Sequence, residues 1–176
     1  MKDINNNVLN YRNEPNLSCN IEVSQKLAEF HASCFTNSEK RYSEKSMLFF
    51  IEKPIYHIFY NHISLVIIQV IGEEAELITL AVDSKRRRKG IGYELLKSSI
   101  IYLEDLDIKK LFLEVATPNQ IALKLYHKVG FTACGLRKGY YGQGTNKKID
   151  ATIMSYTMVT QVTKSLKSDK KKLQNL

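Results

Sequence analysis

Between residues 24 and 52, apolar side chains recur at helical spacing. In the segment SQKLAEFHASCF the recurring positions are Leu27, Phe30, His31, Cys34 and Phe35. A repeat of three to four residues is the pattern of one buried helix face. Ser24 stands where an N-cap residue is expected, so we predict that it begins this helix. A second, shorter helix is expected within residues 43–52.

After residue 54 the pattern becomes that of strands. Segments 55–60 and 64–70 are apolar runs on either side of a turn near Asn61–His62, and 75–82 is a third run after a turn at Gly72–Glu74. Short runs rich in β-branched and aromatic residues, bounded by turn residues, predict strands. Three consecutive strands are therefore expected here.

The second half of the chain alternates between the two patterns. A helix is expected over 90–106, a strand over 110–115, a helix from Asn119 to Gly130, and two closing strands over 131–141 and 150–158. Asparagine is a favoured N-cap, and glycine is favoured just beyond a helix end. A hairpin loop of polar residues, GQGTNKK, is expected between the last two strands. This order predicts an α/β (α+β) fold with a mixed sheet.

Composition fits a single domain with a basic C-terminal tail. The 176 residues carry a formal net charge of +8, and five lysines against one aspartate give residues 161–176 a net of +4. We expect a loose Asn-rich arm over 1–16, one domain over 17–160, and a basic tail over 161–176. The basic body suits an anionic ligand or an anionic assembly such as the ribosome. Contact with nucleic acid is expected only through the tail.

Cysteine and histidine usage indicates a cytoplasmic protein without a metal. Cys19, Cys34 and Cys134 are widely spaced and odd in number, and no CxxC occurs. This is the pattern of a reducing compartment rather than of a disulfide framework or a zinc site. The four histidines have no ligand spacing, and the longest apolar run is too short to span a membrane. We therefore expect no metal, no signal peptide and no membrane segment.

The segment VDSKRRRKGIGYELL, residues 82–96, falls where a predicted strand gives way to a predicted helix. Gly90 and Gly92 remove Cβ atoms at the helix N-terminus, where backbone amides have no acceptor within the helix. With the positive end of the helix dipole these amides form a candidate anion site. The basic run ending at Lys89 raises the local positive potential further.

Two other phosphate-binding motifs do not fit the residues of this loop. A Walker A loop requires Gly-Lys-Ser/Thr, but Ile91 follows Gly90 here. A dinucleotide fingerprint requires a third glycine, where this chain has Leu95. A nuclear signal or a nucleic-acid patch stays open, although neither requires a glycine pair before an amphipathic helix.

Two motifs resemble one family. Arg87-x-x-Gly90-x-Gly92 is similar to the R/Q-x-x-G-x-G/A pyrophosphate loop of the GCN5-related N-acetyltransferases, the GNAT superfamily. LEVATPNQIALKLYHKVGF resembles LEVR-x-S-N-x-x-A-x-x-L-Y-x-x-x-GF, a signature of the bacterial ribosomal-protein-alanine N-acetyltransferases of the RimI type. YY at 140–141 and DATIM at 150–154 also resemble that branch. The resemblance spans residues 17 to 159.

The resemblance implies a single-domain fold whose mixed, twisted sheet splays open at its centre, with flanking helices and acetyl-coenzyme A in the opening. By resemblance, the backbone of Leu80, Ala81 and Val82 meets the acetyl group and the pantetheine arm. The pyrophosphate lies in the loop, and the cofactor also meets the next helix. The implied loop and helix contacts are Arg87, Arg88, Lys89, Gly90, Ile91, Gly92, Tyr93 and Asn119.

The resemblance also implies the catalytic roles. Glu114 matches a proton acceptor, and Tyr126 matches the proton donor to the departing thiolate. An α-amino group has an unperturbed pKa of about 7.7–8.0 against about 10.4 for a lysine amine, so a modest base suffices for a protein N-terminus. Ordinary structural roles stay open for both: a salt-bridge carboxylate and a core tyrosine.

Further residues are expected near the acceptor. Glu76 is a secondary candidate base, and Tyr140 and Tyr141 match the border of the family's peptide-substrate groove. They are equally consistent with an exposed strand carboxylate and with packing tyrosines. Ala116 and Pro118 stand where the branch has arginine and serine, so substrate fit is where this chain departs most from the pattern.

The leading hypothesis is transfer of acetyl from acetyl-coenzyme A to the N-terminal amine of a protein, with a ribosomal protein as partner and direct attack in a ternary complex. One alternative is a GNAT enzyme that acetylates a small amine or a lysine side chain. Another is a ribosome-binding or nucleic-acid-binding module with a vestigial cofactor site.

Overall fold

The computed structural model describes residues 9–10, 17–35, 41–141 and 148–158. The chain divides into two compact units, Met1–Ile71 with Glu76–Ser99 and Gly72–Ala75 with Ile100–Leu176. The predicted fold class, α/β with a mixed sheet, is confirmed. The predicted arm and tail lie outside the described residues, apart from Leu9–Asn10, which form strand β1. Most of the predicted hairpin loop, 142–147, lies outside them as well.

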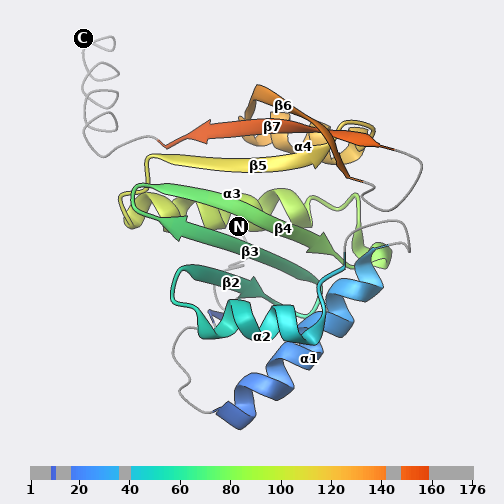
Figure 1. Cartoon of the computed structure of the whole chain (residues 1–176), viewed down its shortest axis with the longest axis vertical. Coiled ribbons are helices and arrows are strands. Elements are labelled where there is room, and N and C mark those ends of the chain that lie inside the picture. Colours follow the sequence, from blue (N-terminus) through green and yellow to red (C-terminus); the bar gives the residue numbers. More distant parts are fainter. Residues whose placement is uncertain (1–8, 11–16, 36–40, 142–147, 159–176) are drawn as a thin grey trace, which may run out of the picture. The chain divides into compact units, whose positions relative to one another are not determined.

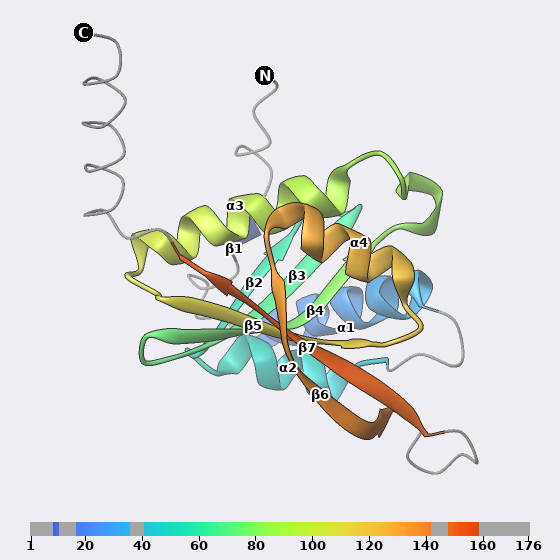
Figure 2. The same cartoon turned by 90° about the horizontal axis from the view of Figure 1, so that it is seen from above.

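Helices cover both faces of the strands in the first unit. Strand β1 pairs antiparallel with β2, and β2 with β3. In Figures 1 and 2, α1 and α2 lie on one face of β2, β3 and β4, and α3 lies on the other. Besides β1, the elements that lie wholly in this unit are α1 (Leu17–Cys34), α2 (Glu44–Glu52), β2 (Tyr56–Tyr60), β3 (Ser64–Ile71) and the 3-10 helix η3 (Ser84–Arg86). The unit also holds most of β4 (Glu74–Val82) and of α3 (Ile91–Asp105).

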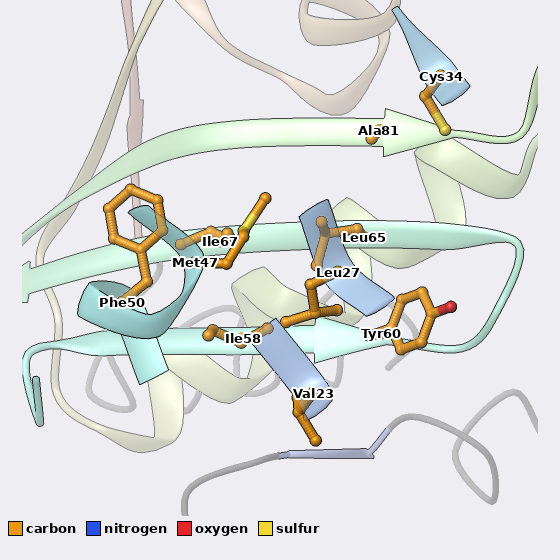
Figure 3. Close-up of a cluster of buried hydrophobic side chains, with 10 residues drawn as sticks. All are labelled: Val23, Leu27, Cys34, Met47, Phe50, Ile58, Tyr60, Leu65, Ile67 and Ala81. Atoms are coloured by element: carbon orange, nitrogen blue, oxygen red, sulfur yellow. The ribbon is translucent and has the colours of Figure 1, made fainter. Parts of the chain in front are cut away.

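The apolar face of α1 builds the core of this unit. Leu27 of α1, Met47 of α2 and Leu65 of β3 are fully buried and belong to one cluster. Figure 3 shows these side chains converging from both helices and from β2 and β3. Burying one such side chain stabilises a fold by about 1.5–3 kcal/mol, so this cluster anchors α1 and α2 to the strands.

The predicted start of the first helix is wrong. Helix α1 begins at Leu17, and Ser24 lies fully buried inside it. The Ser24 hydroxyl donates to the carbonyl of Ile21 at 2.7 Å instead of accepting an amide at a helix start. A serine inside a helix satisfies its hydroxyl by bonding back to the preceding turn, so it did not mark a boundary.

The second unit holds a three-strand arrangement in which β7 lies between β5 and β6 and pairs antiparallel with both. Its elements are β5 (Lys110–Ala116), α4 (Gln120–Val129), β6 (Thr132–Tyr141) and β7 (Ile149–Thr157). The predicted limits of α4 are confirmed. The Asn119 side chain accepts the amide of Ala122 at 3.1 Å, and Gly130 follows the helix with φ of 115°.

Candidate active site

The candidate cofactor loop joins β4 to α3 in the first unit. Leu80, Ala81 and Val82 end the strand, and α3 begins at Ile91. Between them Arg88 (φ 61°) and Gly90 (φ 81°) take left-handed backbone conformations. Glycine adopts this region freely, whereas a non-glycine residue there carries strain that clusters at ligand sites.

Gly90 closes the loop onto the helix. Its carbonyl accepts the amide of Glu94 at 3.0 Å, the first hydrogen bond of α3. A Cβ built on Gly90 meets no atom within 4 Å, so the backbone conformation and not crowding requires glycine here. The amides at the start of the helix, those of Ile91 and Gly92 among them, have no acceptor within α3. The loop thus has the donors and the dipole that a pyrophosphate requires.

Arg87 ties this loop to the end of α1. Its Nε donates to the carbonyl of Val82 at 3.2 Å, and its guanidinium also donates to the carbonyl of Cys34, the last residue of α1. The next carbonyl, that of Phe35, accepts from Arg41 at 2.6 Å. Two cations therefore satisfy carbonyls at the negative end of this helix. The neighbouring side chains of Arg86, Arg88 and Lys89 are exposed.

The candidate catalytic carboxylate lies on β5 in the second unit. The Glu114 side chain is 17% exposed, and its Oε1 accepts a hydrogen bond from Nη1 of Arg137 at 2.9 Å. Glu114 lies opposite Ile153 of β7, and Arg137 of β6 lies opposite Ala151 of the same strand. Directly opposed residues share a face, so Arg137 reaches Glu114 across β7. The ion pair thus joins two strands that are not neighbours.

An irregularity in β6 gathers two tyrosines beside this carboxylate. From the pair Arg137–Ala151 to the pair Tyr141–Ile149, β6 advances four residues and β7 two. Gly139 takes φ of 63° in this bulge, and its amide donates to Oδ1 of Asp150 at 2.8 Å. A bulge bends a strand and redirects its side chains.

The two tyrosines contact the carboxylate site from the bulge. The Tyr141 hydroxyl donates to the main-chain carbonyl of Glu114 at 3.3 Å. The Tyr140 ring centre lies 4.2 Å from the guanidinium carbon of Arg137. The predicted residues Glu114, Tyr140 and Tyr141 therefore lie together, with Arg137 between them.

Tyr126 of α4 is buried, with 8% of its surface exposed. Burial, and secondarily the proximity of Tyr141, raises the pKa of this phenol far above its ordinary value. The hydroxyl is protonated at neutral pH, as a proton donor must be, and the shift moves its ionisation still further from that pH. Its ring also packs 5.8 Å from that of Phe131, so it serves the core as well.

Two other predicted residues, Asn119 and Glu76, have other neighbours. The exposed Asn119 uses its side-chain oxygen as the cap of α4. Glu76 of β4 belongs to the first unit, where it lies near Tyr42 and Tyr56. Burial, followed by the charge of Glu76, raises the pKa of Tyr42 to about 12.

Sequence reasoning missed Arg137. Its contact depends on the register of two strand pairs, which no local pattern reveals. The one available signal was a basic residue two positions before the sequence Gly-Tyr-Tyr. Within the described ranges, no group of three or more His, Cys, Asp or Glu side chains is placed to hold a metal ion. No helix in the same ranges is long and apolar enough to cross a membrane.

Comparisons with known proteins agree with these features. Residues 24–131 match the acetyltransferase (GNAT) family. The chain is 39% identical over 95 residues to the [ribosomal protein bS18]-alanine N-acetyltransferase of Haemophilus ducreyi, a match that covers 54% of this chain and 66% of that relative. The chain thus spans slightly less than two thirds of this relative's length.

Solved structures share the fold. The crystal structure of the ribosomal-protein-S18-alanine N-acetyltransferase from Escherichia coli superposes with a TM-score of 0.69 and 28% identity, over 78% of this chain and 88% of that one. An acetyltransferase from Salmonella typhimurium, solved with its cofactor acetyl-CoA, matches with a TM-score of 0.64 and 15% identity over 79% and 90% of the chains. At that identity the second likeness concerns the fold alone.

Proposed function

Because this chain belongs to the acetyltransferase (GNAT) family, we propose that it is an N-acetyltransferase whose acceptor is the α-amine of a protein N-terminus. The substrate we propose is the N-terminal alanine of a ribosomal protein, and the donor is acetyl-coenzyme A. The relatives named for this reaction in Haemophilus ducreyi and Escherichia coli support that choice. The observation that carries the proposal is the half-buried Glu114 with Tyr140 and Tyr141 beside it.

Acetyl-coenzyme A is assigned to the loop before α3. The backbone amides from Arg88 to Tyr93 bind its pyrophosphate, and Leu80 to Val82 offer the backbone of the strand end. Arg87 fixes the loop through its two carbonyl contacts, and Lys89 and Asn119 complete the set. When bound, acetyl-coenzyme A supplies a thioester that is reactive toward a neutral amine. The match of residues 24–131 to the acetyltransferase (GNAT) family supports this assignment.

Glu114 takes the proton from the substrate ammonium group. A carboxylate suffices because the ammonium form of an α-amine has a pKa of about 7.7–8.0 and loses its proton much more readily than a lysine side chain, whose pKa is about 10.4. Tyr126, a phenol that is protonated at neutral pH, donates a proton to the sulfur as the thiolate departs, and the proton that the attacking nitrogen loses as the amide forms restores the phenol. Tyr140 and Tyr141 border the acceptor peptide, and Glu76 is a secondary contact. The amine attacks directly, without an acyl-enzyme.

Two conservative variants test these roles. Glu114→Gln is expected to lower kcat roughly 100-fold, within the usual contribution of a general base. Tyr126→Phe is expected to lower it less, about tenfold, because a thiolate leaves readily. Both should keep the wild-type Kd for coenzyme A, measured by calorimetry. If both variants retain full turnover, the assigned roles are wrong.

Matched controls separate chemistry from folding. Glu52→Gln removes an exposed carboxylate at the end of α2. Tyr156→Phe removes a hydroxyl from the same aromatic cluster as Tyr126, since its ring lies 5.5 Å from that of Phe131. Both controls should retain wild-type turnover. Equal losses in a variant and its control would assign the effect to packing or net charge instead.

A further inference from the structure

The ion pair across β7 has a consequence for the chemistry of Glu114. We propose that Arg137 is a positioning residue, which holds one carboxylate oxygen of Glu114 so that the other is presented to the substrate amine. This inference rests on the proposed function, in which Glu114 accepts the proton. It adds to that function a side chain that acts through Glu114.

The strand register builds a path for this contact. Ala151 of β7 lies directly opposite both Ala116 of β5 and Arg137 of β6. Neighbouring strands are about 4.8 Å apart, so the Arg137 side chain crosses roughly 10 Å of sheet surface. The small Ala151 is fully buried although Arg137 itself is exposed. A long side chain at 151 would occupy the space through which the arginine passes.

A glycine helps to keep this path open. Gly135 lies opposite Ile153, the residue that also faces Glu114. A Cβ on Gly135 would come within 3.3 Å of Cδ1 of Ile153, so the isoleucine uses the space that the glycine leaves. The register places Ala151 and Ile153 on one face of β7. Arg137 directly opposes Ala151, the smaller of the two, so its side chain has room to cross the strand.

The guanidinium is fixed on two sides. Its Nη1 donates to Oε1 of Glu114 at 2.9 Å, and its carbon lies 4.2 Å from the centre of the Tyr140 ring. A cation over an aromatic face is attracted by the ring quadrupole. Tyr141 holds the main chain of Glu114 from the same bulge. Across the described residues, the hydrogen bond to the carboxylate of Glu114 comes from Arg137 and engages one oxygen.

The exposure of the ion pair indicates that it orients Glu114 rather than stabilises the fold. The Arg137 side chain is 57% exposed, and ion pairs at that exposure contribute little to folding. A base, however, must present a lone pair to the proton within a narrow range of angles. Because Oε1 accepts the hydrogen bond from Arg137, rotation of the Glu114 carboxylate is limited, and the lone pairs of Oε2 keep a fixed orientation for the substrate amine.

The experiment is a double-mutant cycle between Arg137 and Glu114. Arg137→Gln is expected to lower kcat about tenfold, the effect of a base left poorly oriented, with KM for a peptide bearing a free N-terminal alanine within about twofold of wild type. Arg137→Lys should restore part of the loss because it returns a cation. In the Glu114→Gln background, Arg137→Gln should cause no further loss, since the group that it orients is gone.

Two further variants guard against effects on folding and on net charge. Lys138→Gln removes the same charge from an exposed side chain one position along β6 and should keep wild-type kcat. Ala151→Leu blocks the path without changing charge, and it should reproduce the kcat loss of Arg137→Gln. Thermal midpoints of the Arg137 variants should stay close to wild type. Wild-type kcat in Arg137→Gln, or an equal loss in the Glu114→Gln background, would overturn the inference.

Failure of the inference differs from failure of the proposed function. If the wild-type enzyme acetylates a lysine side chain and not a free N-terminus, the proposed acceptor is wrong, and the same cycle on the lysine peptide decides the role of Arg137. If the wild type acetylates the free N-terminus while the cycle shows independent effects, the proposed function stands and the inference falls. Absence of transfer to either amine would overturn both.

Discussion

A buried histidine at the end of α1 is expected to make the stability of this protein depend on pH. His31 is fully buried, with its Nε2 3.0 Å from Oγ1 of Thr79. Its ring lies 4.5 Å from that of Phe35 and 5.1 Å from that of Tyr42. Burial, followed by the nearby charge of Arg41, lowers the pKa of His31 from 6.5 to about 4. The folded protein therefore holds this side chain neutral.

The sign and size of the effect follow from proton linkage. As pH falls below 6.5 the unfolded chain binds a proton that the folded protein does not bind, so the free energy of unfolding decreases until about pH 4. The full difference between the two pKa values corresponds to about 3 kcal/mol of unfolding free energy. Between pH 7.5 and pH 5 the free energy of unfolding falls by about 2 kcal/mol. A charged imidazole would also carry a proton on Nδ1, which has no hydrogen-bond partner in the described structure.

Urea unfolding at these two pH values measures this loss. The wild-type decrease is to be compared with that of His31→Gln, which lacks the titrating group, and with His127→Gln on the exposed face of α4. We expect the decrease to shrink by about 2 kcal/mol in His31→Gln and to stay unchanged in His127→Gln. Equal pH dependence in all three proteins would refute the reasoning. So would an imidazole of His31 that titrates near 6.5 by NMR.

Three further predictions concern the cofactor loop and its surroundings. Gly90→Ala forces an alanine to φ of 81°, so it should lose about 1–2 kcal/mol of stability and, by calorimetry, most of its affinity for coenzyme A. Gly72→Ala carries similar strain in the turn after β3 (φ 60°) and should lose stability alone; equal coenzyme A affinity in the two variants would contradict the assigned loop. Asn119→Ala should cost about 1 kcal/mol in urea unfolding through loss of the cap, and Asn119→Asp should not; equal stability would contradict the capping role. Arg87→Gln should speed amide hydrogen exchange at the end of α1 even without cofactor, and unchanged exchange would show that Arg87 does not hold that helix end.

Local signals made much of the fold predictable. Helix α4 begins after Asn119 and ends before Gly130 because a side-chain cap and a left-handed glycine act within a few residues of their own position. The β3–β4 turn at Gly72 is predictable for the same reason. The loop before α3 was recognised because its glycines stand between a strand and a helix, a relation visible in the sequence.

The features that sequence reasoning missed depend on tertiary contacts. Ser24 resembles an N-cap in isolation, but the buried face of α1 extends beyond it to Val23, which is 9% exposed, so packing continued the helix. Arg137 meets Glu114 only because β7 lies between their strands with Ala151 in register. The bulge at Gly139 depends likewise on the side chain of Asp150. Register and bulge are set by pairing over long sequence separation, which a single sequence does not reveal.

The acceptor specificity tests the central claim most directly. Two peptides with the same ribosomal-protein sequence, one with a free N-terminal alanine and one with that amine blocked and an internal lysine retained, are incubated with the protein and acetyl-coenzyme A. Mass spectrometry then locates the added acetyl group. The account predicts one acetyl on the N-terminal amine of the first peptide and none on the second. Acetylation of the lysine at an equal rate in both peptides would contradict it.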